Sequence, residues 1–230
     1  MEVTKDMALL YGIIAGDGCL SRSCGNYFIS ITCNFYDDIP FFDEVVQPLL
    51  EKITGKKINY RLRKNHGKIE FNFTNKTLFE FFENLKFPVG KKGTRLLIPD
   101  QLEKYKSELI SGYFATDGSL VLTNNNGTMY PRLEIQSISQ KILVQVLEHL
   151  ESFGLRGAVY NVPIPQNMNR QSTYRLQLNG IGNLLTFEEK IGFLNPKHRT
   201  KMRNYIKSRG SSVVERHKAK LIDVQSTSVC

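Results

Sequence analysis

Two aspartates, Asp17 and Asp117, stand one hundred residues apart in matching surroundings, and they are the residues of this chain best suited to chemistry. Residues 10–20 read LYGIIAGDGCL and residues 110–120 read ISGYFATDGSL, so that each aspartate follows an apolar run and precedes a glycine. The runs predict buried helices, and a carboxylate at a helix C-terminus opposes the macrodipole by about 0.3–1 kcal/mol. We therefore expect something to compensate both negative charges.

Small residues at helical spacing predict how the two aspartates meet. They form one stripe on each predicted helix: Gly12, Ala15 and Gly16 on the first, Gly112, Ala115 and Thr116 on the second. Such stripes let two helix backbones pack closely about a pseudo-twofold axis, which brings the two helix ends together. Adjacent carboxylates repel unless they are protonated or bridged by a cation, and Mg²⁺ prefers oxygen ligands. The alternative is that Asp-Gly only ends each helix in a turn, but repetition of the whole segment favours a metal site.

The elements that position this site also occur twice. Each copy is predicted as helix, two strands, helix, two strands, helix, which gives an α+β fold. In the first copy we expect helices at 6–17, 38–53 (capped by Asp37 or Asp38, with a possible kink at Pro48) and 76–85, a strand at 26–34 and hairpin strands at 57–63 and 68–74. In the second we expect helices at 102–117, 139–153 and 180–190 and strands at 119–124, 130–137, 157–163 and 172–179.

The chain divides accordingly into an N-terminal half at 1–85, a linker at 86–100 with two prolines and two glycines, and a C-terminal half at 101–209. Residues 195–209 predict a basic helix at best, and 210–230 a frayed or disordered tail. Antiparallel sheets tolerate one wet face, so each half should present an open, polar platform.

The composition points to a polyanionic partner and an intracellular protein. There are 31 Lys and Arg against 22 Asp and Glu, a net charge of +9, although a basic surface can also serve solubility alone. We find no signal peptide and no apolar run long enough for a membrane span, and expect a cytoplasmic location. The four cysteines lack zinc-finger spacing and should be reduced thiols, partly buried in strands, and the four histidines should be surface or packing residues.

The two motifs resemble a known family. LLYGIIAGDG and LISGYFATDG are similar to the paired signature of LAGLIDADG homing endonucleases, GKKGTRLLIPDQL resembles the stretch before the second signature, and the similarity spans roughly residues 5–205. The resemblance implies two pseudosymmetric αββαββα halves that form a saddle of antiparallel sheets over DNA, and cleavage of both strands across a minor groove. It also implies that Asp17 and Asp117 bind the catalytic metal ions, with the backbone carbonyls of Gly16 and Thr116 as auxiliary ligands.

The resemblance further implies Mg²⁺ as cofactor, with Mn²⁺ substituting and Ca²⁺ supporting binding without cleavage. Each attacking water would act in line while the cations neutralise charge on the phosphate. One basic auxiliary residue stays unassigned, because family members often place Lys or Gln beside the metals. The corresponding region offers Asn34, Thr74, Gln136 and Asn179, with Lys76 nearby.

Outward strand positions are candidate DNA contacts, since Asn, Gln and Arg can read base edges in the major groove. In the first half these are Ser21, Arg22, Asn26, Phe28, Ser30, Thr32, Lys57, Asn59, Arg61, Arg63, Lys68, Glu70 and Asn72. In the second half they are Asn124, Asn126, Arg132, Glu134, Gln136, Asn161, Arg170, Thr173, Arg175 and Gln177. Glu70 and Glu134 suit phosphate least, so each should meet a base amino group, pair with an arginine or face solvent.

The target is expected to be long and only approximately palindromic, about two turns of duplex. At the offset of one hundred, Arg61 is matched by Asn161 and Arg63 by Pro163, so the two reading surfaces differ. We predict a monomeric, freestanding and intron-encoded enzyme that makes a double-strand break in duplex DNA. The alternative is an intron maturase, or a DNA- or RNA-binding protein, that retains the fold without cleavage.

Overall fold

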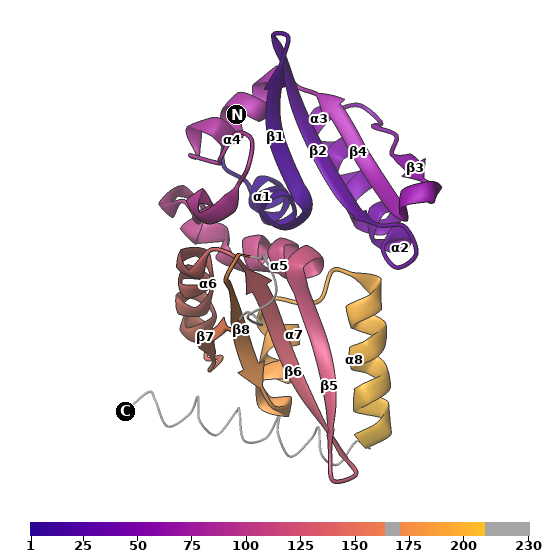
Figure 1. Cartoon of the computed structure of the whole chain (residues 1–230), viewed down its shortest axis with the longest axis vertical. Coiled ribbons are helices and arrows are strands. Elements are labelled where there is room, and N and C mark those ends of the chain that lie inside the picture. Colours follow the sequence, from indigo (N-terminus) through magenta and orange to yellow (C-terminus); the bar gives the residue numbers. More distant parts are fainter. Residues whose placement is uncertain (164–170, 210–230) are drawn as a thin grey trace.

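A computed structural model describes residues 1–163 and 171–209. It contains two four-stranded antiparallel sheets, with strand orders β1-β2-β4-β3 and β5-β6-β8-β7, related by the same succession of helices and strands (Figure 1). The predicted α+β fold with two pseudosymmetric halves is confirmed. No helix among the described residues is both long enough and apolar enough to cross a membrane.

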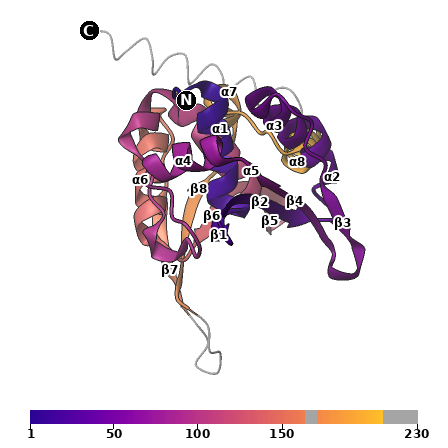
Figure 2. The same ribbon diagram turned by 90° about the horizontal axis from the view of Figure 1, so that it is seen from above.

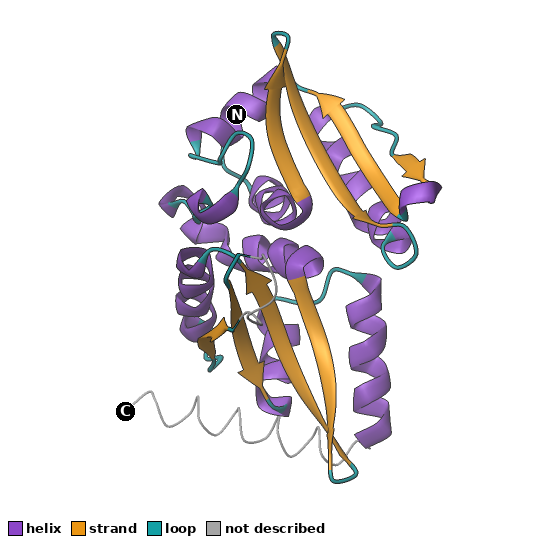
Figure 3. Cartoon of the chain, in the orientation of Figure 1, coloured by secondary structure: helices purple, strands orange, loops and turns teal. Residues whose placement is uncertain are grey.

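The first sheet and its helices follow each other closely in the chain (Figure 3). The elements are α1 (Lys5–Asp17), β1 (Gly18–Ser23), β2 (Asn26–Asn34), α2 (Ile39–Phe41), the π-helix η1 (Phe42–Val46), α3 (Gln47–Thr54), β3 (Arg61–Arg63), the 3-10 helix η2 (Lys64–His66), β4 (Lys68–Thr74) and α4 (Lys76–Asn84). Short 3-10 turns η3 (Gly93–Arg95) and η4 (Asp100–Tyr105) occupy and follow the segment predicted as a linker.

The second sheet repeats this order and adds one helix. The elements are α5 (Lys106–Asp117), β5 (Gly118–Asn125), β6 (Thr128–Ser137), α6 (Gln140–Ser152), β7 (Ala158–Val162), β8 (Thr173–Asn179), α7 (Ile181–Lys190) and α8 (Pro196–Arg209). The basic helix expected at 195–209 is therefore present as α8, which lies beside β5 and buries Met202 and Tyr205 (Figure 1).

Strand β1 was not predicted by residue range, and three other elements differ most from the predictions. The strand expected at 57–63 is reduced to Arg61–Arg63, an edge strand on which Leu62 is 45% exposed, and short edge strands are a common protection against pairing with other chains. The helix expected from residue 102 is α-helical only from Lys106, because the preceding turn after Pro99 tightens into 3-10 geometry.

The third difference is at the helix expected over 38–53. It is α-helical only at its ends, with the π-helix η1 immediately before the turn that contains Pro48. Proline has no backbone N–H and its ring clashes with the carbonyl four residues earlier, so a local change of hydrogen bonding there is expected. Asp38 precedes this helix without capping it, because its side chain is used elsewhere.

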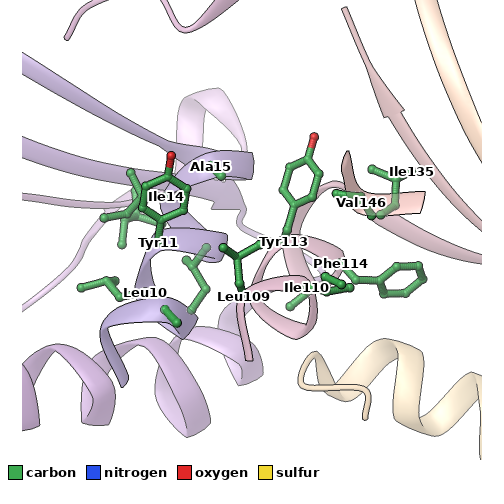
Figure 4. Packing of buried hydrophobic residues seen from close by; sticks show 14 of the residues in the cluster. Leu10, Tyr11, Ile14, Ala15, Leu109, Ile110, Tyr113, Phe114, Ile135 and Val146 are labelled. Carbon is green, nitrogen blue, oxygen red and sulfur yellow. The ribbon is translucent and has the colours of Figure 1, made fainter. Parts of the chain in front are cut away.

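The core is shared by both halves. Helices α1 and α5 lie side by side at the centre of the molecule, and the other helices cover the same side of the two sheets, so that the opposite sheet faces remain open (Figures 1 and 2). Tyr11, Ile14, Tyr113 and Phe114 are almost fully buried around this helix pair (Figure 4). The apolar character of α1 on every side, which the sequence shows, follows from this central position.

Candidate active site

The central helices touch through their backbones. A Cβ atom placed on Gly12 would lie 2.1 Å from the carbonyl oxygen of Leu109, and one placed on Gly112 would lie 2.4 Å from that of Leu9. Real Cβ atoms do not approach backbone atoms so closely, and only glycine fits at these two positions. The predicted stripe of small residues is therefore the contact surface.

This packing brings the two aspartates together at the same end of the helix pair. A Cβ atom on Gly16 would lie 2.0 Å from Thr116 Oγ1 and 3.3 Å from the carboxyl carbon of Asp117. Gly18 and Gly118 then start strands β1 and β5, so each aspartate lies where a central helix meets its sheet. The sequence prediction that Asp17 and Asp117 are neighbours in space agrees with this geometry.

Both carboxyl groups are harder to ionise than ordinary aspartates. Burial and, next, the charge of Asp17 raise the pKa of Asp117 to about 7, although Lys92 and a hydrogen bond from Tyr113 act in the opposite direction. Burial also raises the pKa of Asp17, while a hydrogen bond from Cys33 opposes this rise. Two buried carboxylates that repel one another form a site that a cation would stabilise.

The two aspartates have different hydrogen-bond partners. Cys33 Sγ donates to Asp17 Oδ2 at 3.0 Å, and burial raises the pKa of this thiol, so that it stays a protonated donor. Asp117 instead accepts a hydrogen bond from the Tyr113 hydroxyl. The two halves of the site are thus related by position but are chemically distinct.

Lys92 is a candidate for the basic residue that sequence reasoning did not assign. Its Nζ donates to the carbonyl oxygens of Ile14 at 3.1 Å, Ala15 at 2.7 Å and Gly16. Burial lowers the pKa of Lys92, while the charges of Asp117 and Asp17 raise it. The segment GKKG resembled the family, but nothing in the sequence distinguishes Lys92 from Lys91.

The residues first considered for this role have other partners or lie at strand ends. Lys76 pairs with Glu80 at 3.7 Å on α4, and Asn179 accepts from Arg132 at 2.9 Å. Gln136 donates to Thr173 at 2.9 Å. Asn34 ends β2 and Thr74 ends β4.

A second interaction that the sequence did not indicate ties the two halves together. Asp38, which is 5% exposed, accepts from Asn195 Nδ2 at 3.0 Å and from Lys197 Nζ at 2.8 Å. The same Asn195 amide also donates to the carbonyl oxygen of Ala115 at 3.0 Å. Lys92 thus contacts the last turn of α1, and Asn195 contacts that of α5.

A polar pocket of about 470 Å³ opens beside Asp17. Its lining residues are Asp17, Thr32, Cys33, Asn34, Asp38, His66, Gly67, Lys68 and Thr116. Within the described ranges no group of three His, Cys, Asp or Glu side chains could hold a metal ion.

The strand registers show which of the predicted DNA contacts lie on the open face of each sheet. Positions that alternate with the buried core residues carry Ser21, Asn26, Phe28, Ser30, Thr32, Arg61, Arg63, Lys68, Glu70 and Asn72 in the first half. In the second half they carry Arg132, Glu134, Gln136, Thr173, Arg175 and Gln177. Glu70 pairs with Arg63 at 2.8 Å and Glu134 with Arg132 at 3.1 Å. Of the three expected alternatives, pairing with an arginine is therefore the one observed for both glutamates.

Three predicted contacts lie on the helix side instead. Arg22 alternates with Ser21, shares the face of buried Leu20 and donates to Glu83 of α4 at 2.5 Å. Asn124 lies on the face of Leu120, and its Oδ1 accepts from the N–H of Gly127 in the β5–β6 turn at 2.9 Å.

Asn161 is the third. It stands opposite Tyr174, whereas Tyr160 stands opposite outward-facing Arg175, so that Tyr160, not Asn161, is the structural counterpart of Arg61. Arg61 and Tyr160 are 99 residues apart, one fewer than the offset of the motifs (160 − 61 = 99). A register error of one residue turns every side chain of a strand to the other face.

The remaining candidates lie outside the strands. Lys57 and Asn59 precede β3, and Asn126 lies in the β5–β6 turn with φ of 49°. Arg170 and the predicted tail at 210–230 lie outside the described residues.

The comparisons with known proteins agree with this geometry. Residues 104–192 match the family model described as LAGLIDADG-like domain. Residues 104–192 are thus similar in sequence to a LAGLIDADG-like domain. The suspected family resemblance is confirmed in this half by sequence and across both halves by fold.

Several solved structures share the fold over most of the chain. The LAGLIDADG homing endonuclease I-LtrWI bound to target DNA has a TM-score of 0.58 at 12% identity, covering 96% of each chain. The LAGLIDADG meganuclease I-AabMI bound to uncleaved DNA has a TM-score of 0.56 at 13% identity, covering 93% of this chain and 92% of its own. A mesophilic variant of the homing endonuclease I-DmoI has 0.56 at 18% identity, covering 81% and 94%.

Two sequence relatives are uncharacterized proteins of Methanocaldococcus jannaschii. One is 22% identical over 163 residues and the other 26% identical over 204 residues, which is 70% and 84% of this chain. The chain spans 59% of the length of the first relative and 21% of that of the second.

The raised pKa of Asp117 predicts how the stability of the metal-free protein depends on pH. The pKa of Asp117 is about 7 in the folded protein, whereas an aspartate of an unfolded chain has a pKa of about 4. Between these two pH values the folded state therefore binds more protons than the unfolded state. The metal-free protein should therefore lose stability as pH rises through this window, and Asp117→Asn should remove much of that loss. Thermal melts in a chelator at about pH 5 and about pH 8 measure it, and an equal change in parent and variant would contradict it.

Proposed function

We propose that this protein is a site-specific DNA endonuclease that makes a double-strand break by divalent-metal-dependent hydrolysis. The observation that carries the proposal is the pair of buried carboxylates, Asp17 and Asp117, at the adjacent ends of two touching helices. The ends lie between two open sheets, which fits one reaction centre flanked by two recognition surfaces (Figure 1).

The donor set suits a hard divalent cation. Carboxylate oxygens and the last carbonyls of each helix, those of Gly16 and Thr116, are the ligand type that Mg²⁺ prefers, and bound cations would relieve the repulsion between the carboxylates. I-DmoI has been crystallised with DNA and Mn, with DNA and Ca, and, as a variant, with target DNA and Mg. We propose Mg²⁺ as the cofactor here, with Mn²⁺ substituting and Ca²⁺ supporting binding alone. When bound, the cations would supply charge neutralisation at the scissile phosphate and activation of the attacking water.

The protein groups of the site have separable roles in this proposal. Asp17 and Asp117 would hold the cations, one carboxylate for each DNA strand. Lys92 keeps a positive charge against both carboxylates and orders the last turn of α1 through its three carbonyl contacts. Asn195 orders the last turn of α5 in the corresponding way.

The two sheets would follow the major groove on either side of the helix ends, which then face the minor groove. Two such surfaces cover about two turns of duplex. Equivalent positions differ chemically, with Arg61 against Tyr160 and Glu70 against Arg175, which supports a target that is only approximately palindromic. We further propose that the protein acts as a monomer and that it is intron-encoded.

A selection from a randomised duplex library tests this function. The purified protein is incubated with the library and Mg²⁺, and cut ends are captured and sequenced. Recovery of one long consensus with breaks in both strands supports the proposal. Selective binding without any cut ends would instead support the alternative of a maturase or DNA-binding protein that retains the fold.

Lys92 gives a sharper test of the site. Lys92→Met should lower the cleavage rate by about 100-fold, the order found when one preorganised charge-stabilising donor is removed, with little change in DNA affinity. Lys91→Met is the matched control, because Lys91 is exposed and adjacent. Cleavage rates and gel shifts on one target measure both, and equal rates for the two variants would remove Lys92 from the site.

A further inference from the structure

The open face of the second sheet carries a connected group of charged and polar side chains around a carboxylate. Arg132 Nη1 donates to Glu134 Oε1 at 3.1 Å, and Gln177 Nε2 donates to the same oxygen at 3.0 Å. Arg175 Nε lies 3.9 Å from Glu134 Oε2. We call Glu134, Arg132, Arg175 and Gln177 the Glu134 array.

A carboxylate at the centre of a surface that faces a polyanion requires an explanation. The Glu134 side chain is only 15% exposed, whereas those of Arg132 and Arg175 are about one-third exposed, at 33% and 34%. Glu134 is therefore covered by the groups it holds, and they rather than it present themselves outward. Its charge orders the two arginines in the free protein. Without it, their side chains would lose rotamer freedom only when DNA binds.

The contacts leave a defined set of donors free. Arg132 uses Nη1 toward Glu134 and Nε toward Asn179 Oδ1 at 2.9 Å, out of the five N–H groups of a guanidinium. Arg175 turns its Nε toward Glu134, which leaves both terminal nitrogens for a partner. Two adjacent N–H donors at the end of an arginine match the O6 and N7 acceptors of guanine in the major groove.

We propose that Glu134 is a positioning residue that holds Arg132 and Arg175 to read two guanines in the target half-site facing the second sheet. The proposal rests on the proposed DNA-binding function and specifies which base class this half-site requires. Because the arginines are ordered before DNA arrives, binding would lose less conformational entropy than at unsupported arginines.

The first sheet has no such group at the related positions. Gly18 pairs with Ile31 and Gly118 with Ile135, so Ser30 takes the place of Glu134 and Phe28 that of Arg132. Glu70 pairs with Arg63, yet its Oε2 makes no hydrogen bond of good geometry. The guanine requirement is thus predicted for one half-site only.

Binding selections on the full chain test the proposal without relying on cleavage. Parent, Glu134→Gln, Arg132→Lys and the matched control Glu70→Gln are each used to recover bound sites from a randomised duplex library with Ca²⁺ present. We expect Glu134→Gln to weaken the preference for two guanines about tenfold each, and Arg132→Lys to weaken one of them, which identifies the half-site. Glu70→Gln should leave both preferences intact.

A further readout separates positioning from a structural role. Glu134→Gln removes a negative charge, so its affinity for unrelated duplex should stay equal or rise while specific affinity falls. A loss spread equally over all base positions, or unchanged guanine preferences, would overturn the inference while leaving the proposed function standing. If the parent selects no sequence at all, the proposed function fails and the inference fails with it.

Discussion

Replacing either Asp17 or Asp117 with asparagine is expected to abolish or severely reduce double-strand cleavage while DNA binding remains largely intact. Each change removes one of two carboxylates that converge at the helix ends and preserves side-chain shape. The proposed recognition surfaces lie on the sheets, away from these positions. Because Asp17 raises the pKa of Asp117 and burial disfavours both charges, the metal-free variants should also melt no lower than the parent.

Plasmid cleavage and gel shifts on the same target, with Mg²⁺ or Ca²⁺, measure these effects. Asp100→Asn, the same chemical change at an exposed residue of η4, is the control and should cut normally. Nicked plasmid from a single variant would show that the two strands are served by partly independent carboxylates. Full cutting by the doubly substituted protein would refute the site, and lost binding would mean that the helix ends also hold DNA.

The second large effect is expected at the contact between the central helices. Gly12→Ala and Gly112→Ala each place a Cβ within 2.4 Å of a backbone carbonyl oxygen, which cannot rotate away as a side chain could. Overpacking of this kind typically costs about 1–3 kcal/mol, and separation of the helices would also displace both aspartates. Stability and cleavage should therefore fall together.

Gly182→Ala provides the matched control, because Gly182 lies in α7 with no atom within 4 Å of an added Cβ. There alanine should stabilise the helix by roughly 0.5–1 kcal/mol through its higher helix propensity. Thermal melts of the three variants give the comparison. Unchanged melting of Gly12→Ala would mean that the helices do not pack through this stripe.

Repetition in the sequence accounts for most of what could be predicted. The paired motifs revealed two equivalent units, and alternation within each unit located nearly every strand and helix to within a few residues. The nearness of Asp17 and Asp117 also followed from sequence, because a small-residue stripe on both helices leaves few ways to pack them.

The rest depends on contacts between distant residues. Lys92 looks like any linker lysine until its segment folds back over α1, and Asp38 looks like a helix cap until Asn195 and Lys197 reach it across the molecule. Asn161 was misplaced because β3 and β7 are related by an offset of 99 residues and not by the one hundred of the motifs, which composition does not reveal. Local patterns report local structure, and these three cases are tertiary.

The late position of Asn195 and Lys197 in the chain has a consequence for synthesis. Each sheet pairs strands that are close in sequence, so the first sheet can form as soon as its own residues have been made. The contact between α1 and α5 instead joins segments about a hundred residues apart. The hydrogen bond from Asn195 to Asp38 forms later still, because these residues are 157 positions apart. A growing polypeptide therefore forms its first open sheet well before Asp17 and Asp117 can meet. If the proposed function holds, an unfinished chain could contact DNA before it is able to cut it.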